Sequence, residues 1–417
     1  NMISRKVFLS AVATATLMLA TPSMADDHGG TIKFAFIDPL SGGFAATGTN
    51  GLKNFKFFAD EVNRAGGVMG KKFEVIGFDN KISPKESLIQ LKNVIGQGIQ
   101  YVVQGNSSGV ANALTDAIEK HNERNPDKRV LFLNYSAVDP ALTNEKCNFW
   151  HFRFDAHADM KMNAVTDVIA ANKDWTGIYI IGQDYSFGKA VAAAAVKFLG
   201  EKRPDIKIVG NELHPIGKVK DFSPYIAKIK ASGANAIITG NWGADMLGLA
   251  KAAEDAGLDI PMYTYYAAGS GITKAIGAGG VDRINVVAEG AINPPLTDEW
   301  RQIVKRFQAE YPDGNMDQIR INNLMQMTAR AMREAGSTKP IDVARKLEGM
   351  SYTTPYGDQI TMRASDHQMQ LPIRMHVHTD KNIEFAYDQS GYGLLETSTV
   401  SAADSSTPTT CKMKRPS

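Results

Sequence analysis

Hydrophobic and polar positions along this chain follow two alternating patterns. Short apolar runs, typical of buried strands, alternate with longer stretches in which apolar residues recur at helical spacing. In the first third of the chain the strand-like runs are 31–38, 73–78, 101–103 and 130–133, and the helix-like stretches are 51–65, 84–97 and 110–121. This alternation predicts a parallel sheet with helices on both faces.

The same pattern starts again after the segment Phe152–Asp155. Strand-like runs at 175–181, 206–213 and 236–239 alternate with helix-like stretches at 188–199, 225–231 and 244–256. Two such series predict two lobes, and the cleft between them is the expected ligand site. The last third, with helices expected at 298–311 and 318–335 and strands at 359–362 and 373–378, has too few elements for a third core. We therefore expect it to return to both lobes.

Residues 1–25 have the pattern of a signal peptide. Arg5 and Lys6 precede an apolar stretch, Val7–Ala20, and Ser23-Met24-Ala25 form a small-residue cleavage signal. The apolar stretch is shorter than the roughly 20 residues that span a bilayer, which argues against a membrane anchor. We expect cleavage after Ala25 and a mature protein in the periplasm.

Length and charge narrow the class of protein. The 417 residues exceed one comfortable hydrophobic core, which agrees with two lobes. The net charge of +2 is spread along the sequence rather than gathered in basic blocks, so nothing favours nucleic-acid binding. The chain has two cysteines, Cys147 and Cys411. In an oxidising compartment they can pair and hold the Ser- and Thr-rich segment after Gly391; two unpaired thiols are the alternative.

Small hydroxyl-bearing loops follow several predicted strands. Ser107 and Ser108 follow the third strand, and Ser136 follows the fourth. In an open α/β sheet, ligands lie beyond the carboxyl ends of the strands, against helix N-termini whose free N–H groups suit an anion. Residues Gly105–Gly109 also satisfy the G-x-S-x-G pattern of serine hydrolases, between a strand and a helix.

A serine hydrolase would need an acid and a histidine later in the chain. Asp366, His367, His376 and His378 are candidates, but no sequence feature places one of them against Ser107. His376 and His378 would share one strand face without a third metal ligand, and the chain has no phosphate loop or dinucleotide fingerprint. We expect a binding protein rather than an enzyme, without a metal or a cofactor.

Five segments, taken in order, resemble the type I periplasmic solute-binding proteins of ABC importers, in the leucine/isoleucine/valine-binding branch. They are Ile32–Gly42, Asn63–Gly70, Asp139–Thr143, Asp184–Gly188 and Asp221–Pro224. The resemblance implies an α/β fold of two Rossmann-like lobes with parallel central sheets, joined by three hinge crossings. Such a Venus flytrap closes on a small solute and docks on a membrane permease; we expect a monomer. The predicted parts are an N-terminal lobe (31–153 and about 291–360), a C-terminal lobe (154–290 and about 361–390) and a C-terminal tail (391–417).

The resemblance also implies which residues bind the ligand. Ser107 matches the hydroxyl that holds a ligand carboxylate, with Ser108 beside it. In the next loop, Ser136-Ala137-Val138, Val138 stands where amino-acid-binding members carry a threonine that helps to hold the ammonium and the carboxylate. Tyr266 stands where an acidic residue would face the ammonium. Burying an ammonium without a charge partner is costly, which argues against an amino acid ligand.

Aromatic residues take the place of the missing acid. Tyr185 matches the family's ligand-stacking tyrosine, Trp242 matches a second aromatic position, and Phe44 in the first loop could cap the other side. Together with Tyr266, these rings favour a flat aromatic carboxylate that is held at one end by the serines.

A branched-chain or other amino acid is the alternative ligand. Asp184 or Asp245 would then face the ammonium. Arg153 is a further candidate for neutralising a carboxylate, although its place at the predicted crossing equally favours a structural salt bridge.

Overall fold

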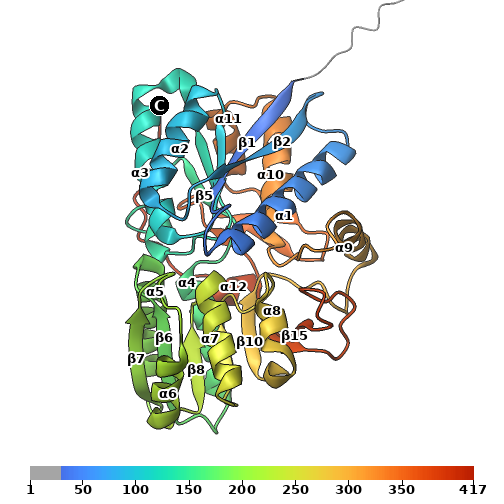
Figure 1. Cartoon of the computed structure of the whole chain (residues 1–417). Helices are drawn as coiled ribbons and strands as arrows, with labels where there is room; N and C mark the ends of the chain where they lie inside the picture. Colours follow the sequence, from blue (N-terminus) through green and yellow to red (C-terminus); the bar gives the residue numbers. More distant parts are fainter. Residues whose placement is uncertain (1–29) are drawn as a thin grey trace, which may run out of the picture.

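The computed structural model describes residues 30–417, which form two α/β lobes, drawn one above the other in Figure 1. The first lobe contains a five-stranded sheet in the order β2-β1-β3-β4-β5, with all neighbours parallel. Its strands are β1 (Thr31–Asp38), β2 (Lys72–Asp79), β3 (Tyr101–Gln104), β4 (Leu131–Asn134) and β5 (His151–Arg153). Its helices are α1 (Ala45–Arg64), α2 (Pro84–Gly96) and α3 (Ser108–Arg124), with 3-10 turns η1 (Pro126–Lys128) and η2 (Pro140–Thr143).

The second lobe contains a seven-stranded sheet in the order β15-β14-β10-β9-β8-β6-β7. The parallel strands are β6 (Gly177–Gln183), β7 (Lys207–His214), β8 (Ala236–Thr239), β9 (Met262–Thr264) and β10 (Ile284–Ala288). Two antiparallel strands complete the sheet, β14 (Ile373–Thr379) and β15 (Gly393–Val400). The helices are α4 (Ala158–Ala171), α5 (Ser186–Lys202), α6 (Ser223–Ser232), α7 (Gly243–Asp255) and α8 (Ile272–Ile276), followed by turn η3 (Gly277–Gly280).

The chain passes between the two lobes four times rather than the predicted three: after β5, after β10, before β14 and again after β15. Between the second and third crossings lie α9 (Asp298–Glu310), α10 (Arg320–Ala335), α11 (Pro340–Leu347) and a small sheet of β11 (Ser351–Thr353), β12 (Gln359–Met362) and β13 (Met369–Gln370). These helices return to the first lobe, where α10 packs on α1 and the rings of Phe57 and Phe307 meet at 5.3 Å. The predicted two-lobed fold is confirmed.

In each lobe the first strand of the sheet along the chain, β1 or β6, is followed closely by a helix, and each of these two helices has a glycine in its first turn. A Cβ at Gly48 in α1 would lie 1.6 Å from the Pro39 carbonyl oxygen, and one at Gly188 in α5 would lie 1.7 Å from that of Gln183. The two helices can therefore approach the loops in front of them only because no side chain intervenes.

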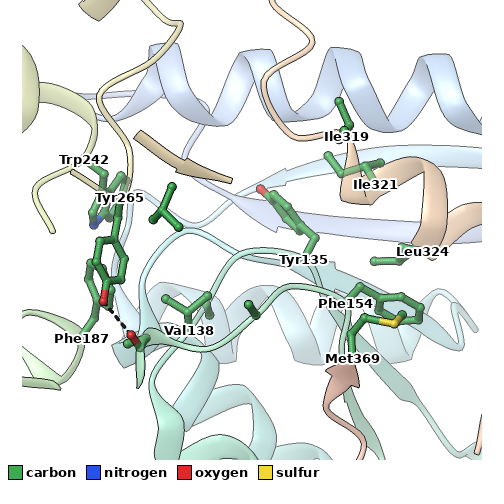
Figure 2. Close-up of a cluster of buried hydrophobic side chains, with 14 of the residues drawn as sticks. Tyr135, Val138, Phe154, Phe187, Trp242, Tyr265, Ile319, Ile321, Leu324 and Met369 are labelled. Atoms are coloured by element: carbon green, nitrogen blue, oxygen red, sulfur yellow. Dashed lines mark hydrogen bonds between the residues drawn. The ribbon is translucent and has the colours of Figure 1, made fainter. Parts of the chain in front are cut away.

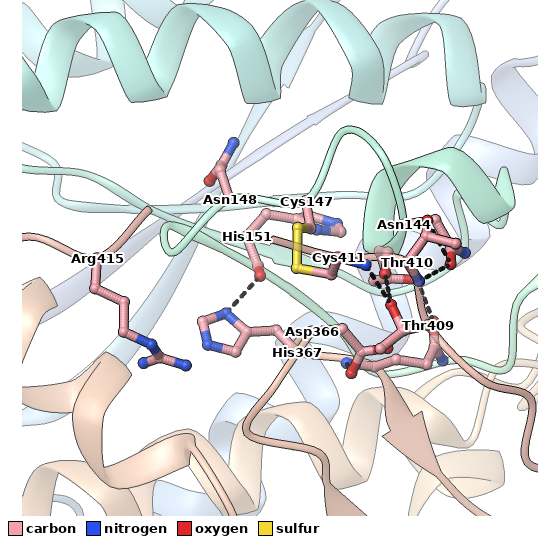
Figure 3. Close-up of a disulfide and its surroundings, with 12 residues drawn as sticks. Asn144, Cys147, Asn148, His151, Asp366, His367, Thr409, Thr410, Cys411 and Arg415 are labelled. Carbon is pink, nitrogen blue, oxygen red and sulfur yellow. Dashed lines mark hydrogen bonds between the residues drawn. A yellow bond between two sulfur atoms is a disulfide. The ribbon is translucent and has the colours of Figure 1, made fainter. Parts of the chain in front are cut away.

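The segment predicted as a C-terminal tail divides into a strand and a strap. Residues 393–400 form β15 in the second sheet. Residues 401–417, which we call the terminal strap, include α12 (Ala402–Ser405) and run back to the first lobe. Cys411 forms a disulfide with Cys147, with the two sulfurs 1.97 Å apart (Figure 3). Farther along, Lys414 forms an ion pair with Glu123 of α3 at 2.8 Å.

Several short elements were not predicted. Phe152 and Arg153, expected to separate the two series, instead end β5, and β9, β10, α4 and α11 were also missed. The expected signal peptide, with cleavage after Ala25, lies outside the described residues. Within residues 30–417, no helix combines the length and the apolar composition needed to cross a bilayer.

Candidate ligand-binding site

A cavity between the lobes brings together most of the predicted site residues. It contains about 1000 Å³ of space not filled by atoms, part of which is open to solvent. Its lining includes Ser107, Ser108, Ser136, Val138, Tyr185, Trp242 and Tyr266. Phe44 and Ala137 are not among the lining residues.

The loop that carries Ser107 is fixed by a buried carboxylate at the end of β1. Asp38 accepts hydrogen bonds from the backbone N–H groups of Gly105 (3.1 Å) and Asn106 (3.0 Å) and from the Tyr135 hydroxyl (2.5 Å). Burial raises the pKa of Asp38 well above its usual range, although these hydrogen bonds act in the opposite direction. Asp38 thus links the carboxyl ends of β1, β3 and β4.

Ser107 caps α3 and presents its hydroxyl to the cavity. Its φ is +84°, a region that residues other than glycine rarely adopt, and the Gln104 side chain stabilises this turn by donating to the Ser107 carbonyl at 3.0 Å. The Ser107 hydroxyl oxygen accepts from the Val110 N–H (3.3 Å), and the Ser108 hydroxyl oxygen accepts from the Asp139 N–H (3.2 Å). Both hydroxyl hydrogens can therefore be donated elsewhere, beside a helix N-terminus that favours an anion.

The following loop is stabilised by Asn134. Its side-chain oxygen accepts from the N–H groups of Ser136 (3.1 Å) and Ala137 (2.8 Å), and its amide donates to the Ala137 carbonyl (2.7 Å). Arg153 donates to the same carbonyl at 3.0 Å and to the Gln368 side chain at 2.7 Å. Ala137 therefore supports the loop. The fully buried Arg153 has a structural role, bonded to carbonyls, to the Gln368 amide and to the Thr143 hydroxyl; among residues 30–417 it forms neither of the two suggested contacts, a salt bridge or a site in the cavity lining.

The aromatic wall belongs to the second lobe. Tyr185 and Trp242 follow β6 and β8, and the Trp242 indole N–H donates to the Tyr185 hydroxyl at 2.8 Å. Figure 2 shows Val138 between Trp242 and its aromatic neighbours on one side and Tyr135 on the other. Phe44, from the first lobe, packs on Trp242 with ring centroids 4.5 Å apart. Phe44 is thus a contact between the lobes rather than a wall of the cavity.

A cluster of charged residues that was not predicted lies at the cavity, with Lys161, Glu289 and Arg320 among its lining residues. We call Asp155, Lys161, Glu289 and Arg320 the central charge cluster; all four are buried. Lys161 pairs with Asp155 (2.8 Å), and Arg320 pairs with Glu289 (3.1 Å) and Asp155 (3.3 Å). Arg320 also donates to the Ser136 hydroxyl at 2.9 Å. Burial opposes the charged form of Arg320, but the carboxylates of Asp155 and Glu289 raise its pKa overall.

Two of these residues carried a signal in the sequence. Glu289 directly follows β10, so it occupies the same carboxyl-end position as the predicted site residues. Lys161 lies on α4 among apolar residues at helical spacing, with Ala158 and Val165 on the same buried face. Both were missed because β10 and α4 were not predicted.

Acidic residues do line the cavity, although not the ones suspected. Asp317 accepts a hydrogen bond from Asn50 (2.9 Å), and burial raises the pKa of Asp317 to about 7. Asp184 is exposed and faces Lys189 (3.8 Å). Asp245 already accepts from Gln183 (2.8 Å) and lies outside the cavity lining.

Three of the four hydrolase candidates are engaged elsewhere. His367 contacts Glu348 at 2.7 Å and stacks on Phe152, Asp366 pairs with Arg363, and His378 contacts the Gly277 carbonyl at 2.8 Å. His376 lines the cavity, but in the part of the chain that the structure describes neither of its ring nitrogens has a hydrogen-bond partner. Among the same residues no group of three or more His, Cys, Asp or Glu side chains is placed to hold a metal.

Comparisons with known proteins agree with this architecture. A sequence model described as periplasmic binding protein matches residues 31–380. The Leu/Ile/Val-binding protein homolog 4 of Brucella abortus is 34% identical over 431 aligned positions, covering 99% of this chain and 100% of that protein. The closed crystal structure of a leucine-, isoleucine-, valine-, threonine- and alanine-binding protein from Brucella ovis has a TM-score of 0.81 at 30% identity, covering 93% of this chain and all of the other. An R. palustris solute-binding protein in complex with 4-hydroxybenzoate has the same fold, with a TM-score of 0.75 at 19% identity over 89% of this chain and 97% of that one.

Proposed function

Because this chain belongs to the periplasmic binding protein family, we propose that it captures a small aromatic carboxylate between its lobes and delivers it to the permease of an ABC importer. The family consists of solute-binding proteins rather than enzymes. What remains to be assigned is the ligand.

The arrangement of hydroxyl groups and aromatic rings around the cavity supports an aromatic carboxylate as the ligand. The hydroxyls of Ser107 and Ser108 at the start of α3 and the hydrogen-bonded rings of Tyr185 and Trp242 line the same cavity, with Val138 also in its wall. A helix N-terminus with free hydroxyl donors suits a carboxylate, and aromatic rings gain offset or edge-on packing with a flat ligand. Val138 offers no hydrogen bond to an ammonium.

Closure would complete the site. The first lobe supplies Ser107, Ser108 and Ser136, and the second lobe supplies Tyr185, Trp242 and Tyr266. The Tyr266 hydroxyl donates to the Ser136 carbonyl across the cleft at 3.4 Å. Since a ligand shifts a conformational equilibrium only through contacts that differ between the two states, we infer that the aromatic residues favour the closed form.

An amino acid ligand is the second candidate, and Asp317 favours it. Burial raises the pKa of this carboxyl to about 7 although the charge of Arg320 opposes the shift, and a ligand ammonium beside it would further favour the carboxylate. The similar protein from Brucella ovis is also named for amino acids that it binds.

Thermal unfolding of the mature protein, measured with one ligand at a time, distinguishes an aromatic acid from an amino acid as the ligand. The ligands are benzoate, 4-hydroxybenzoate, phenylpyruvate, leucine and valine, with calorimetric titration for each one that stabilises. A ligand at 100 times its dissociation constant adds about 2.7 kcal/mol to the free energy of unfolding, which is readily measured. Stabilisation by aromatic acids that is lost in Trp242→Ala supports the proposal, whereas stabilisation by leucine or valine alone contradicts it.

A further inference from the structure

Lys161 is a buried cation that faces the ligand cavity from α4. Its side chain is 2% exposed, and its side-chain hydrogen bond goes to Asp155 at 2.8 Å. Its ammonium nitrogen lies 5.0 Å from the centre of the Tyr266 ring. An ammonium has three N–H donors. Even with the Tyr266 phenol as a second partner, at least one donor remains for a molecule in the cavity.

Arg320, the other cation of the central charge cluster, donates hydrogen bonds to the protein from all three of its guanidinium nitrogens. Its Nε donates to the Tyr135 carbonyl, its Nη1 to both carboxylate oxygens of Glu289 (3.1 and 3.2 Å) and its Nη2 to the Ser136 hydroxyl (2.9 Å). Arg320 therefore uses four of its five N–H donors and positions Ser136, whereas the hydrogen bond of Lys161 to Asp155 uses one of its three donors.

The charges of the cluster cancel. Two carboxylates, Asp155 and Glu289, face two cations, Lys161 and Arg320. Burial opposes the charge of Lys161, but Asp155 raises its pKa overall, so the ammonium keeps its proton at neutral pH. A second carboxylate on the ligand would therefore be buried without compensation, whereas a neutral oxygen can accept from Lys161 without disturbing the balance.

We propose that Lys161 hydrogen-bonds to a neutral oxygen of the ligand, a hydroxyl, ether or keto group, so that the protein selects oxygen-substituted aromatic acids over the unsubstituted acid. This inference rests on the proposed function, because it assumes that the ligand carboxylate is held at Ser107. It makes Lys161 a specificity-determining residue.

The first test changes the ligand and leaves the protein intact. Calorimetric titration compares benzoate, 3- and 4-hydroxybenzoate, terephthalate, and the matched pairs of 3- or 4-methoxybenzoate with the ethylbenzoate of the same size. One hydroxybenzoate should bind about tenfold more tightly than benzoate, and the methoxy acid should exceed its ethyl counterpart because the ether accepts a hydrogen bond. Terephthalate, with a second carboxylate, should bind most weakly.

The second test changes the protein. The double variant Asp155→Asn/Lys161→Met removes one charge of each sign and so keeps the balance of the cluster. We expect it to lose the preference for oxygen substituents, so that a methoxy acid and the ethyl acid of the same size bind equally. Lys251→Met, a control on the exposed face of α7, should retain that preference.

The outcomes distinguish this inference from the proposed function. If aromatic acids bind but the methoxy and ethyl acids bind equally, or if the double variant keeps the wild-type preference, Lys161 does not have this role and the proposed function stands. If no aromatic acid binds and leucine does, the proposed ligand class is wrong, and the role of Lys161 is refuted with it. Should the double variant fail to fold, the comparison of methoxy and ethyl acids still decides.

Discussion

Phe44 offers the sharpest test of closure because it touches the other lobe without touching the ligand cavity. Its ring packs on Trp242, with centroids 4.5 Å apart, and the side chain is 5% exposed. The ring fits against two glycines of the second lobe: a Cβ at Gly217 would lie 2.8 Å from it, and one at Gly243 would lie 2.6 Å away. When the lobes separate, this contact is lost.

The effect of Phe44→Ala follows from these contacts. Full burial of a phenylalanine stabilises by about 1.5–3 kcal/mol, and an aromatic pair adds about 0.5–1.5 kcal/mol. Because α1 shields part of the ring in any state, we expect the closed form to lose about 1.5–3 kcal/mol, which corresponds to about 10- to 150-fold weaker ligand binding. The ligand-free protein should lose much less stability.

Calorimetric titration with the ligand identified by thermal shift measures this loss, and thermal unfolding without ligand measures stability. Phe198→Ala is the control, since Phe198 is a partly buried ring on α5 that packs beside Lys197 and Lys202 of its own helix. It should lower stability and leave affinity unchanged. Wild-type affinity in Phe44→Ala, or an equal loss of stability with and without ligand, would refute the role of Phe44 in closure.

Three further predictions concern the site and the terminal strap. Tyr185→Phe removes the acceptor of the Trp242 N–H and should weaken ligand binding by about 1 kcal/mol, roughly fivefold in a titration; an unchanged affinity would place the pair outside the site. Replacing both Cys147 and Cys411 by serine opens a loop of 264 residues and should lower the free energy of unfolding by about 2–5 kcal/mol in denaturant titrations, with no further change on adding a reductant. Asp317 has a raised pKa of about 7 in the folded state, so its protonated form is the stabilised one: that stability is fully present below about pH 4 and is lost as the pH rises through 7. Asp317→Asn should therefore lose this component of the pH dependence, and a wild-type pH profile in the variant would contradict the assignment; the substitution should also abolish binding of an amino acid but not of an aromatic acid.

The fold was largely predictable because its signal is repeated. Buried parallel strands such as β1 are continuous apolar runs, and the helices between them carry apolar residues at helical spacing. The pattern of strand and helix therefore occurs several times within each lobe. The missed strands β5 and β9 have three residues each, too few for any periodicity to emerge. The prediction that residues 393–400 belong to a tail was wrong, because strand β15 is defined by its pairing with β14, and no local sequence pattern encodes that pairing.

The candidate site was predictable where a residue directly follows the end of a strand, and not elsewhere. Ser107 was predicted because it follows a strand, and Tyr185 and Trp242 because they match aromatic positions of the family and also follow strands; all three line the cavity. Lys161 was missed together with its helix α4. Arg320 was missed because an arginine in a helix is normally on the surface, and the carboxylates of Asp155 and Glu289 that pair with it come from distant parts of the chain. The contact of Phe44 with Trp242 depends on how the lobes meet, which neither segment determines alone.

The position of the disulfide also constrains the order of events during maturation. Cys147 precedes its partner by 264 residues, and all the strands of the second sheet lie between them. In a chain that enters an oxidising compartment N-terminus first, Cys147 is a free thiol until the terminal strap arrives. During that interval Cys147 can form a disulfide only with a thiol of another molecule. Since the chain has two cysteines, a monomer cannot form a wrong pairing. Alkylation of free thiols in newly exported protein would therefore measure the fraction of molecules in which the terminal strap has not yet docked. Disulfides between two molecules would be the characteristic product of failed maturation.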